Sequence, residues 1–137
     1  MMFEINYLAV LVSAVAMMVL GYLWYGPLFG KPWMKLTEMS EKDMKGNTGI
    51  AMAKTYGLMF VSALILSYVF DHILIAFQTA SVGMAVQGAI WTWLGFIATT
   101  MFSGVLFAKK PVKLFVIDAG YYLVGLIIVG VILTMWQ

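Results

Sequence analysis

Four long apolar stretches constrain this chain most strongly, because they fix the solvent in which it folds. They run over residues 5–28, 51–77, 84–108 and 114–136, and each holds about 22–27 residues. A helix rises ~1.5 Å per residue, so each stretch is long enough to cross a hydrocarbon core of ~30 Å. The sequence therefore predicts an all-α integral membrane protein, with residues 1–137 forming a single four-helix bundle.

Composition supports this class and excludes several others. Hydrophobic residues make up 64% of the chain and charged residues 10%, against ~25% charged in a typical soluble domain. The chain has no cysteine, which excludes thiol exchange and thiolate metal sites, and its one histidine cannot supply both axial ligands of a haem within one chain. The net charge of +2 is too small to indicate nucleic-acid binding. We expect no cofactor and no enzymatic activity.

The lysines predict the orientation in the membrane. All eight basic residues lie in the first and third gaps between the apolar stretches or at their edges: Lys31, Lys35, Lys42, Lys45, Lys54, Lys109, Lys110 and Lys113. Cytoplasmic loops of membrane proteins carry an excess of lysine and arginine. We therefore expect a multi-pass protein of the bacterial inner membrane, with both termini on the extracytoplasmic side.

The first cytoplasmic loop is predicted to hold a short surface helix. Residues 40–43 read Ser-Glu-Lys-Asp, an N-cap followed by acids in the first turn, and this helix would end near residues 46–47. Upstream, Pro27 disfavours helical geometry in the residue before it, so we expect the first span to end at Tyr25 or Gly26. Trp24, Tyr25 and Trp33 lie where an interfacial aromatic belt belongs.

Two faces of small residues indicate close helix packing. Gly95, Thr99 and Ser103 are spaced four apart in the third stretch, and Ala63 and Ser67 have the same spacing in the second. Such faces let two helix backbones approach closely, either within the chain or between subunits. Residues 26–32 also resemble residues 104–111, which indicates either an internal duplication or the common composition of cytoplasmic helix exits.

The sequence resembles a known family. Residues 23–33 read Leu-Trp-Tyr-Gly-Pro-Leu-Phe-Gly-Lys-Pro-Trp, residues 6–8 read Asn-Tyr-Leu, and residues 109–122 include a proline, an aspartate and a tyrosine at matching places. This pattern is similar to a bacterial membrane family, the domain of unknown function 1761. The resemblance implies a small four-span protein and carries over no activity. The motif residues are Trp24, Tyr25, Gly26, Pro27, Lys31 and Trp33.

Asp118 is the best candidate for a functional side chain, because ionisable groups inside a membrane are costly and need partners. It lies about one turn inside the fourth stretch, and an unpaired charge at full depth costs ~2.5–3.5 kcal/mol. Lys54, at a similar depth in the second stretch, could pair with it. The alternatives are a structural ion pair, a carboxylate that reaches the headgroups beside Lys109 and Lys113, or a role in handling protons or cations.

Three polar residues near the outer side are weaker candidates. Asp71 and His72 adjoin near the outer end of the second stretch, and the alternatives for the pair are an interfacial helix end, a proton switch or part of a metal site. Neighbours on a helix diverge by ~100°, however, so the two do not face each other. Asn6 either caps the first helix or bonds across to another one.

The functional hypotheses follow from these candidates. The first is a non-enzymatic bundle that associates with itself or with another membrane protein, most simply as a homo-oligomer. The alternative is an oligomeric transporter or channel with Asp118 and Lys54 lining a polar path. A lipid- or quinone-modifying enzyme is a third possibility without a visible nucleophile or metal site. Membrane lipids are expected partners, with anionic headgroups at Lys109, Lys110 and Lys113.

Overall fold

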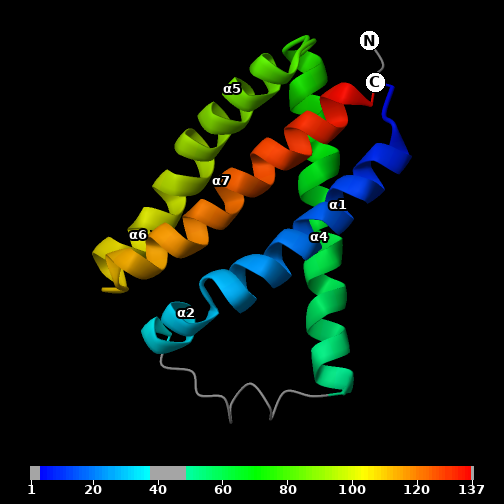
Figure 1. The fold of residues 1–137 in the computed structure, drawn as a ribbon. Coiled ribbons are helices and arrows are strands. Elements are labelled where there is room, and N and C mark those ends of the chain that lie inside the picture. Colours follow the sequence, from blue (N-terminus) through cyan, green and yellow to red (C-terminus); the bar gives the residue numbers. More distant parts are fainter. Residues whose placement is uncertain (1–3, 38–48, 137) are drawn as a thin grey trace.

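The computed structural model describes residues 4–37 and 49–136, and Figure 1 shows how their helices are arranged. Four helical rods are long and apolar enough to cross a membrane: Tyr7–Leu28, Ile50–Ala76, Val82–Phe107 and Val112–Met135. Each begins and ends within two residues of the predicted span. The expected fold class is confirmed, because the described residues are all-α and the four candidate spans pack as a bundle. The surface helix expected over residues 40–47 lies outside the described residues.

The first span starts with α1 (Tyr7–Leu23), which is capped by Asn6. The Oδ1 atom of Asn6 accepts a hydrogen bond from the amide of Ala9 at 3.1 Å, which satisfies one of the unpaired donors at the helix start. The side-chain amide of Asn6 donates to the carbonyl of Trp136 at 2.8 Å. This bond ties the start of the first span to the end of the last, and both chain ends lie at the same end of the molecule (Figure 1).

The first span continues through Pro27, which corrects the expected end at Tyr25 or Gly26. The chain winds here as a π-helical segment, η1 (Trp24–Leu28). A π-helix bonds each amide to the carbonyl five residues back, and the amide just after the segment bonds to the carbonyl of Trp24 at 2.8 Å. The wider turn accommodates the proline ring, which in an α-helix clashes with the carbonyl four residues earlier. A short helix, α2 (Gly30–Leu36), follows.

The second span is one unbroken helix, α4 (Ile50–Ala76), which turns back into α5 (Val82–Thr92). At the turn, Gln78 takes a positive φ of 53°, and the amide of Thr79 bonds to the carbonyl of Leu74 at 2.9 Å. These are the features of a Schellman motif, which satisfies carbonyls at the end of a helix. The turn therefore needs no glycine to reverse the chain.

The third span consists of three segments and the fourth of one. After α5 come a second π-helical segment, η2 (Trp93–Ala98), and α6 (Thr99–Phe107). The chain reverses at Lys109, where φ is 55°. The last helix, α7 (Val112–Met135), begins directly after Pro111, whose fixed φ suits the start of a helix.

The last helix lies at the centre of the bundle. α1 packs along one side of α7 and α5 along the other, while α4 crosses α1 and meets α7 less extensively (Figure 1). Of the two small-residue faces, Ala63 and Ser67 are buried in α4, so this face packs within the chain. Gly95, Thr99 and Ser103 are exposed in the third span.

The two glycines within residues 23–33, Gly26 and Gly30, are expected to differ sharply in their tolerance of a side chain. A Cβ atom on buried Gly30 would lie 2.7 Å from the backbone oxygen of Tyr25, whereas a Cβ on Gly26 would meet nothing within 4 Å. Because the backbone cannot move aside as a side chain can, Gly30→Ala should destabilise the fold by ~1–3 kcal/mol. Gly26→Ala is the matched control and should leave the thermal midpoint nearly unchanged. Equal melting of the two variants in detergent would contradict the packing described for η1 and α2.

Candidate functional site

Asp118 lies in the second turn of α7 and is bonded to a residue of the family-like motif. Its Oδ1 atom accepts a hydrogen bond from the hydroxyl of Tyr25 at 2.7 Å, and both side chains are half-buried. A carboxylate within a membrane span requires such a donor, because hydrocarbon offers none. The π-helical turn η1 places Tyr25 on the side of the first span that faces α7. The bond therefore joins the first and last spans at the depth of the acid.

Two indole groups hold α7 on either side of Asp118. The Nε1 atom of Trp24 donates to the carbonyl of Ile117 at 2.9 Å, and the Nε1 atom of Trp93 donates to the carbonyl of Ala119 at 2.7 Å. Residues 117 and 119 point about 200° apart around a helix, so the two indoles reach α7 from nearly opposite sides. Both tryptophans are the first residues of π-helical segments, η1 and η2.

Further tyrosines extend this cluster toward the middle of the membrane. Tyr121 is buried, and its hydroxyl donates to the carbonyl of Met17 in α1 at 3.0 Å. Its ring lies 5.5 Å from that of Tyr25 and 5.0 Å from that of Tyr122, measured between centroids. The ring of Trp33 meets Tyr25 edge-on at 5.5 Å. We call Trp24, Tyr25, Trp33, Trp93, Tyr121 and Tyr122 the aromatic cluster.

A cavity of about 240 Å³ opens beside Asp118, between α6 and α7. Its polar lining consists of Asp118, Lys110, Thr100 and Ser103, and the remainder is mainly apolar. The side chain of Lys110 lies over Gly104, whose Cβ position is 3.4 Å from the Cδ atom of the lysine. An acid, an amine and two hydroxyls therefore share one cavity near the lysine-bearing end of the bundle.

Lys54 does not join this group. It is exposed near the start of α4, and the residues that line the Asp118 cavity belong to α6, α7 and the turn between them. Within the described residues, Asp118 forms its hydrogen bond with Tyr25 and no ion pair with Lys54. The motif residue Lys31 is likewise exposed, on α2.

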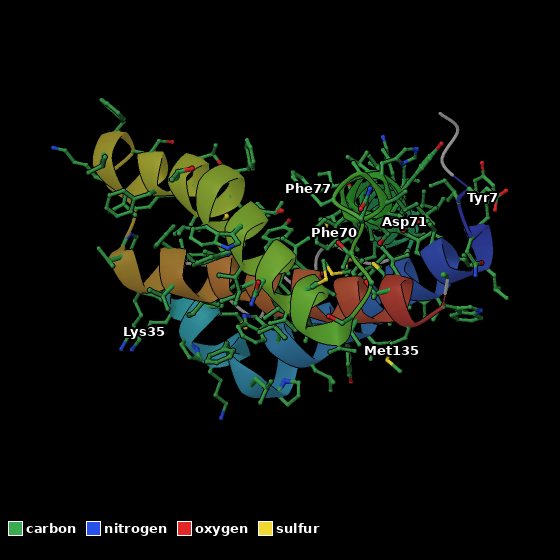
Figure 2. All side chains as sticks on the ribbon, turned by 90° about the horizontal axis from the view of Figure 1, so that it is seen from above. Tyr7, Lys35, Phe70, Asp71, Phe77 and Met135 are labelled. Atoms are coloured by element: carbon green, nitrogen blue, oxygen red, sulfur yellow. The ribbon has the colours of Figure 1, made fainter. Side chains whose placement is uncertain are left out.

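The Asp71–His72 pair lies near the other end of α4. Asp71 is buried on the side of α4 that faces α1 and α7 (Figure 2). The Nδ1 atom of His72 lies 2.8 Å from the carbonyl of Tyr68, one turn back on the same helix, and the two rings meet edge-on. The side chains thus diverge, as expected for neighbours on a helix. In the described part of the chain, no group of three His, Cys, Asp or Glu residues could hold a metal ion.

Sequence reasoning found Asp118 and missed its partners. We placed Trp24 and Tyr25 in an interfacial belt, whereas their polar atoms point at α7. One signal was available: an acid one turn inside the last span needs a donor, and Tyr25 lies at a similar depth in the first span. Chemically, the arrangement can hold a carboxylate in a fixed orientation and offer it to a cationic group in the adjacent cavity.

The two indole bonds give the next prediction. Trp24→Phe and Trp93→Phe each remove one donor from α7 and keep an aromatic ring. Hydrogen bonds between membrane helices average ~0.6 kcal/mol and reach ~1.7 kcal/mol, so each variant should lose unfolding free energy in this range plus some packing. Trp91→Phe is the control, because Trp91 is 71% exposed and its indole donates to no described residue. The measurement is the free energy of unfolding in mixed micelles. If Trp91→Phe lowers it as much as Trp24→Phe and Trp93→Phe do, the two indole hydrogen bonds do not stabilise α7.

Comparison with known proteins places the chain in a family. Its sequence matches the family described as "Protein of unknown function (DUF1761)" over residues 8–134, a range that includes Asp118 and both π-helical segments. No curated protein and no solved structure matched in the same comparisons. Because the match extends over nearly the whole sequence, this chain belongs to the DUF1761 family and is a small membrane protein with four candidate spans.

Proposed function

We propose that this protein is a non-enzymatic membrane component that works by associating with a second copy of itself. The observation that carries this proposal is the first half of α4, which extends away from its own bundle. Every residue from Ile50 to Met59 is exposed except Met52, which is partly buried. The later half of the same helix packs against α1 through buried small residues.

The unpacked half of α4 has a surface suited to another helix. Ala53 and Gly57 are spaced four apart, both are exposed, and a Cβ atom on Gly57 would meet nothing within 4 Å. Small residues at this spacing let two membrane helices approach closely and gain van der Waals contact. The later half of α4 already packs on another helix through small residues. Its first half has small residues at the same spacing, so it is suited to bind a further helix.

The proposed orientation in the membrane makes the two copies parallel. We propose that the lysine-bearing end is cytoplasmic, in a bacterial inner membrane, and that both termini are extracytoplasmic. In Figure 1 both termini lie at one end of the molecule, and α2, the start of α4 and the α6–α7 turn lie at the other, which supports this assignment. Two copies inserted alike can pair α4 with α4 about a twofold axis along the membrane normal.

The alternative function, transport along a path lined by Asp118 and Lys54, has less support. Lys54 lies on the unpacked half of α4, apart from the cavity that holds Asp118. Asp118 is bonded to Tyr25, which belongs to the aromatic cluster and whose ring lies 5.5 Å from that of Tyr121. A transport role would need a polar path that continues from Asp118 past that cluster to the other side of the membrane.

Crosslinking tests the self-association. The chain contains no cysteine, so a single cysteine can be introduced without first replacing native ones. Under mild oxidation in native membranes, Gly57→Cys should form disulfide-linked dimers. Met59→Cys is the matched control, because it is exposed at nearly the same depth but about 200° around the helix, and it should stay monomeric.

A blocking variant sharpens the result. Adding Gly57→Leu to an Ala53→Cys reporter should reduce the crosslinked fraction at least tenfold, because the larger side chain prevents close approach. Equal crosslinking at positions 57 and 59, or no effect of Gly57→Leu, would refute association through this face.

A further inference from the structure

We propose that the cavity between α6 and α7 binds a single-chain glycerophospholipid, in which the phosphate lies at Lys110 and the free hydroxyl of the glycerol lies at Asp118. This site is on a different surface from the α4 association and does not depend on it. The proposal follows from the depth of each charged group in the membrane and from the hydrogen-bonding capacity that each polar side chain in the cavity has left.

The deeper part of the cavity presents hydrogen-bond acceptors. Asp118 uses its Oδ1 atom to accept from Tyr25, and its Oδ2 atom accepts no hydrogen bond from the described residues. Ser103 Oγ donates its proton to the carbonyl of Thr100 at 2.7 Å, and Thr100 Oγ1 donates to the carbonyl of Phe96 at 2.8 Å. A hydroxyl has one proton, so both groups have only lone pairs left to offer. A ligand bound at this depth must therefore bring a donor.

The shallower part of the same cavity carries a positive charge. The side chain of Lys110 lies against α6 at Gly104, where its Cδ atom is 3.4 Å from the position of a Cβ atom. Among the described residues, Lys110 and Asp118 form no ion pair with each other. Lys109 and Lys113 are exposed and lie close to Lys110 in the chain. Lysines at a membrane surface attract lipid phosphate groups, so this end of the cavity is suited to a phosphate.

The depths of these groups in the membrane set the polarity of the ligand. α6 ends at Phe107 and α7 begins at Val112, so a short turn holds the two helix ends at a similar level. Along the helix axes, Gly104 lies ~4.5 Å from the end of α6 and Asp118 lies ~9 Å from the start of α7. The ligand's donor must therefore lie a few ångströms deeper in the membrane than its phosphate.

A glycerophospholipid with one acyl chain has this polarity. Its phosphate lies at the membrane surface, its free glycerol hydroxyl lies a few bonds deeper, and its acyl chain continues into the hydrocarbon. The cavity volume of about 240 Å³ equals ~8 water molecules at ~30 Å³ each, which suits the glycerol and the groups bonded to it. The apolar side chains of the lining are suited to the start of the acyl chain: Met101, Val105, Leu114 and Phe115.

Two other classes of membrane lipid match this cavity less well. A diacyl phospholipid has ester oxygens where the single-chain lipid has its hydroxyl, so it would place acceptors against the acceptors at Asp118. A zwitterionic headgroup carries its ammonium outside the phosphate, so that cation would lie at the lysines and not at the acid. Because Thr100 and Ser103 are exposed within a candidate span, a bilayer lipid reaches the cavity from the side.

Native mass spectrometry of the detergent-solubilised full chain tests the proposal with ligands that share one acyl chain type and the phosphate: 1-acyl-glycerol 3-phosphate, its 2-deoxy analogue and the diacyl phosphatidic acid. The wild-type protein should bind the first at least ~10-fold more tightly than the others, because it alone donates a hydrogen bond to the carboxylate. Asp118→Asn should remove this preference, because it places a donor in the cavity while keeping an oxygen that accepts from Tyr25. Glu4→Gln is the matched control, because it removes an exposed carboxylate outside the cavity lining, and it should preserve the preference.

A second variant tests the phosphate end of the site without disturbing the fold. Lys110 is exposed, and Lys110→Gln removes its charge while leaving the Tyr25–Asp118 bond in place. This variant should weaken the binding of all three lipids by a similar factor and keep the preference. Equal binding of the first lipid and its 2-deoxy analogue, an unchanged preference in Asp118→Asn, or unchanged affinities in Lys110→Gln would overturn the proposal. Free glycerol 3-phosphate that displaces the lipid at equal concentration would also overturn it, because the site would then take a soluble phosphate.

Discussion

The bond between Tyr25 and Asp118 is the interaction on which the lysine-bearing half of this bundle depends. A carboxylate inside a membrane helix is costly, and hydrocarbon supplies no donor to offset that cost. The protein supplies one from the first span, and it adds an indole donor to the backbone carbonyl on each side of the acid. α7 is thereby fixed between the first and third spans at one depth. Packing of α7 along α1 and α5 extends this contact toward the chain termini.

The two π-helical segments explain how the first and third spans reach the same helix. Each opens with a tryptophan and has a glycine two residues later: Trp24 and Gly26 in η1, Trp93 and Gly95 in η2. The wider turn alters the direction of the side chains that follow, and π-helical turns are frequent at functional sites. This correspondence differs from the repeat suggested by sequence, which aligned residues 26–32 with residues 104–111. A duplication of the two halves stays a prediction, and the structure offers a second alignment on which to base it.

Hydropathy alone predicted the four spans to within two residues, because length and apolar content decide whether a helix can cross a bilayer. It also singled out Asp118, since a charge in such a span is rare. The partners of Asp118 could not be predicted. A tryptophan near the end of a span gives the same sequence signal whether its side chain faces lipid headgroups or a neighbouring helix. The π-helical turn that directs Tyr25 toward α7 contains Pro27, and a proline normally ends or kinks a helix. The Lys54–Asp118 pair does not form in the structure, because Lys54 lies on the exposed first half of α4 and equal depth does not bring two side chains together.

A double-mutant cycle between Tyr25 and Asp118, read as unfolding free energy in mixed micelles, tests the central claim most directly. Tyr25→Phe should destabilise the wild-type protein, because it leaves the carboxylate without its donor, and should be almost neutral once Asp118→Leu has removed the charge. The account predicts a coupling of ~1–2 kcal/mol between the two positions. Tyr22→Phe, on an exposed residue of the same span, should show none. An equal cost of Tyr25→Phe in both backgrounds would contradict the account.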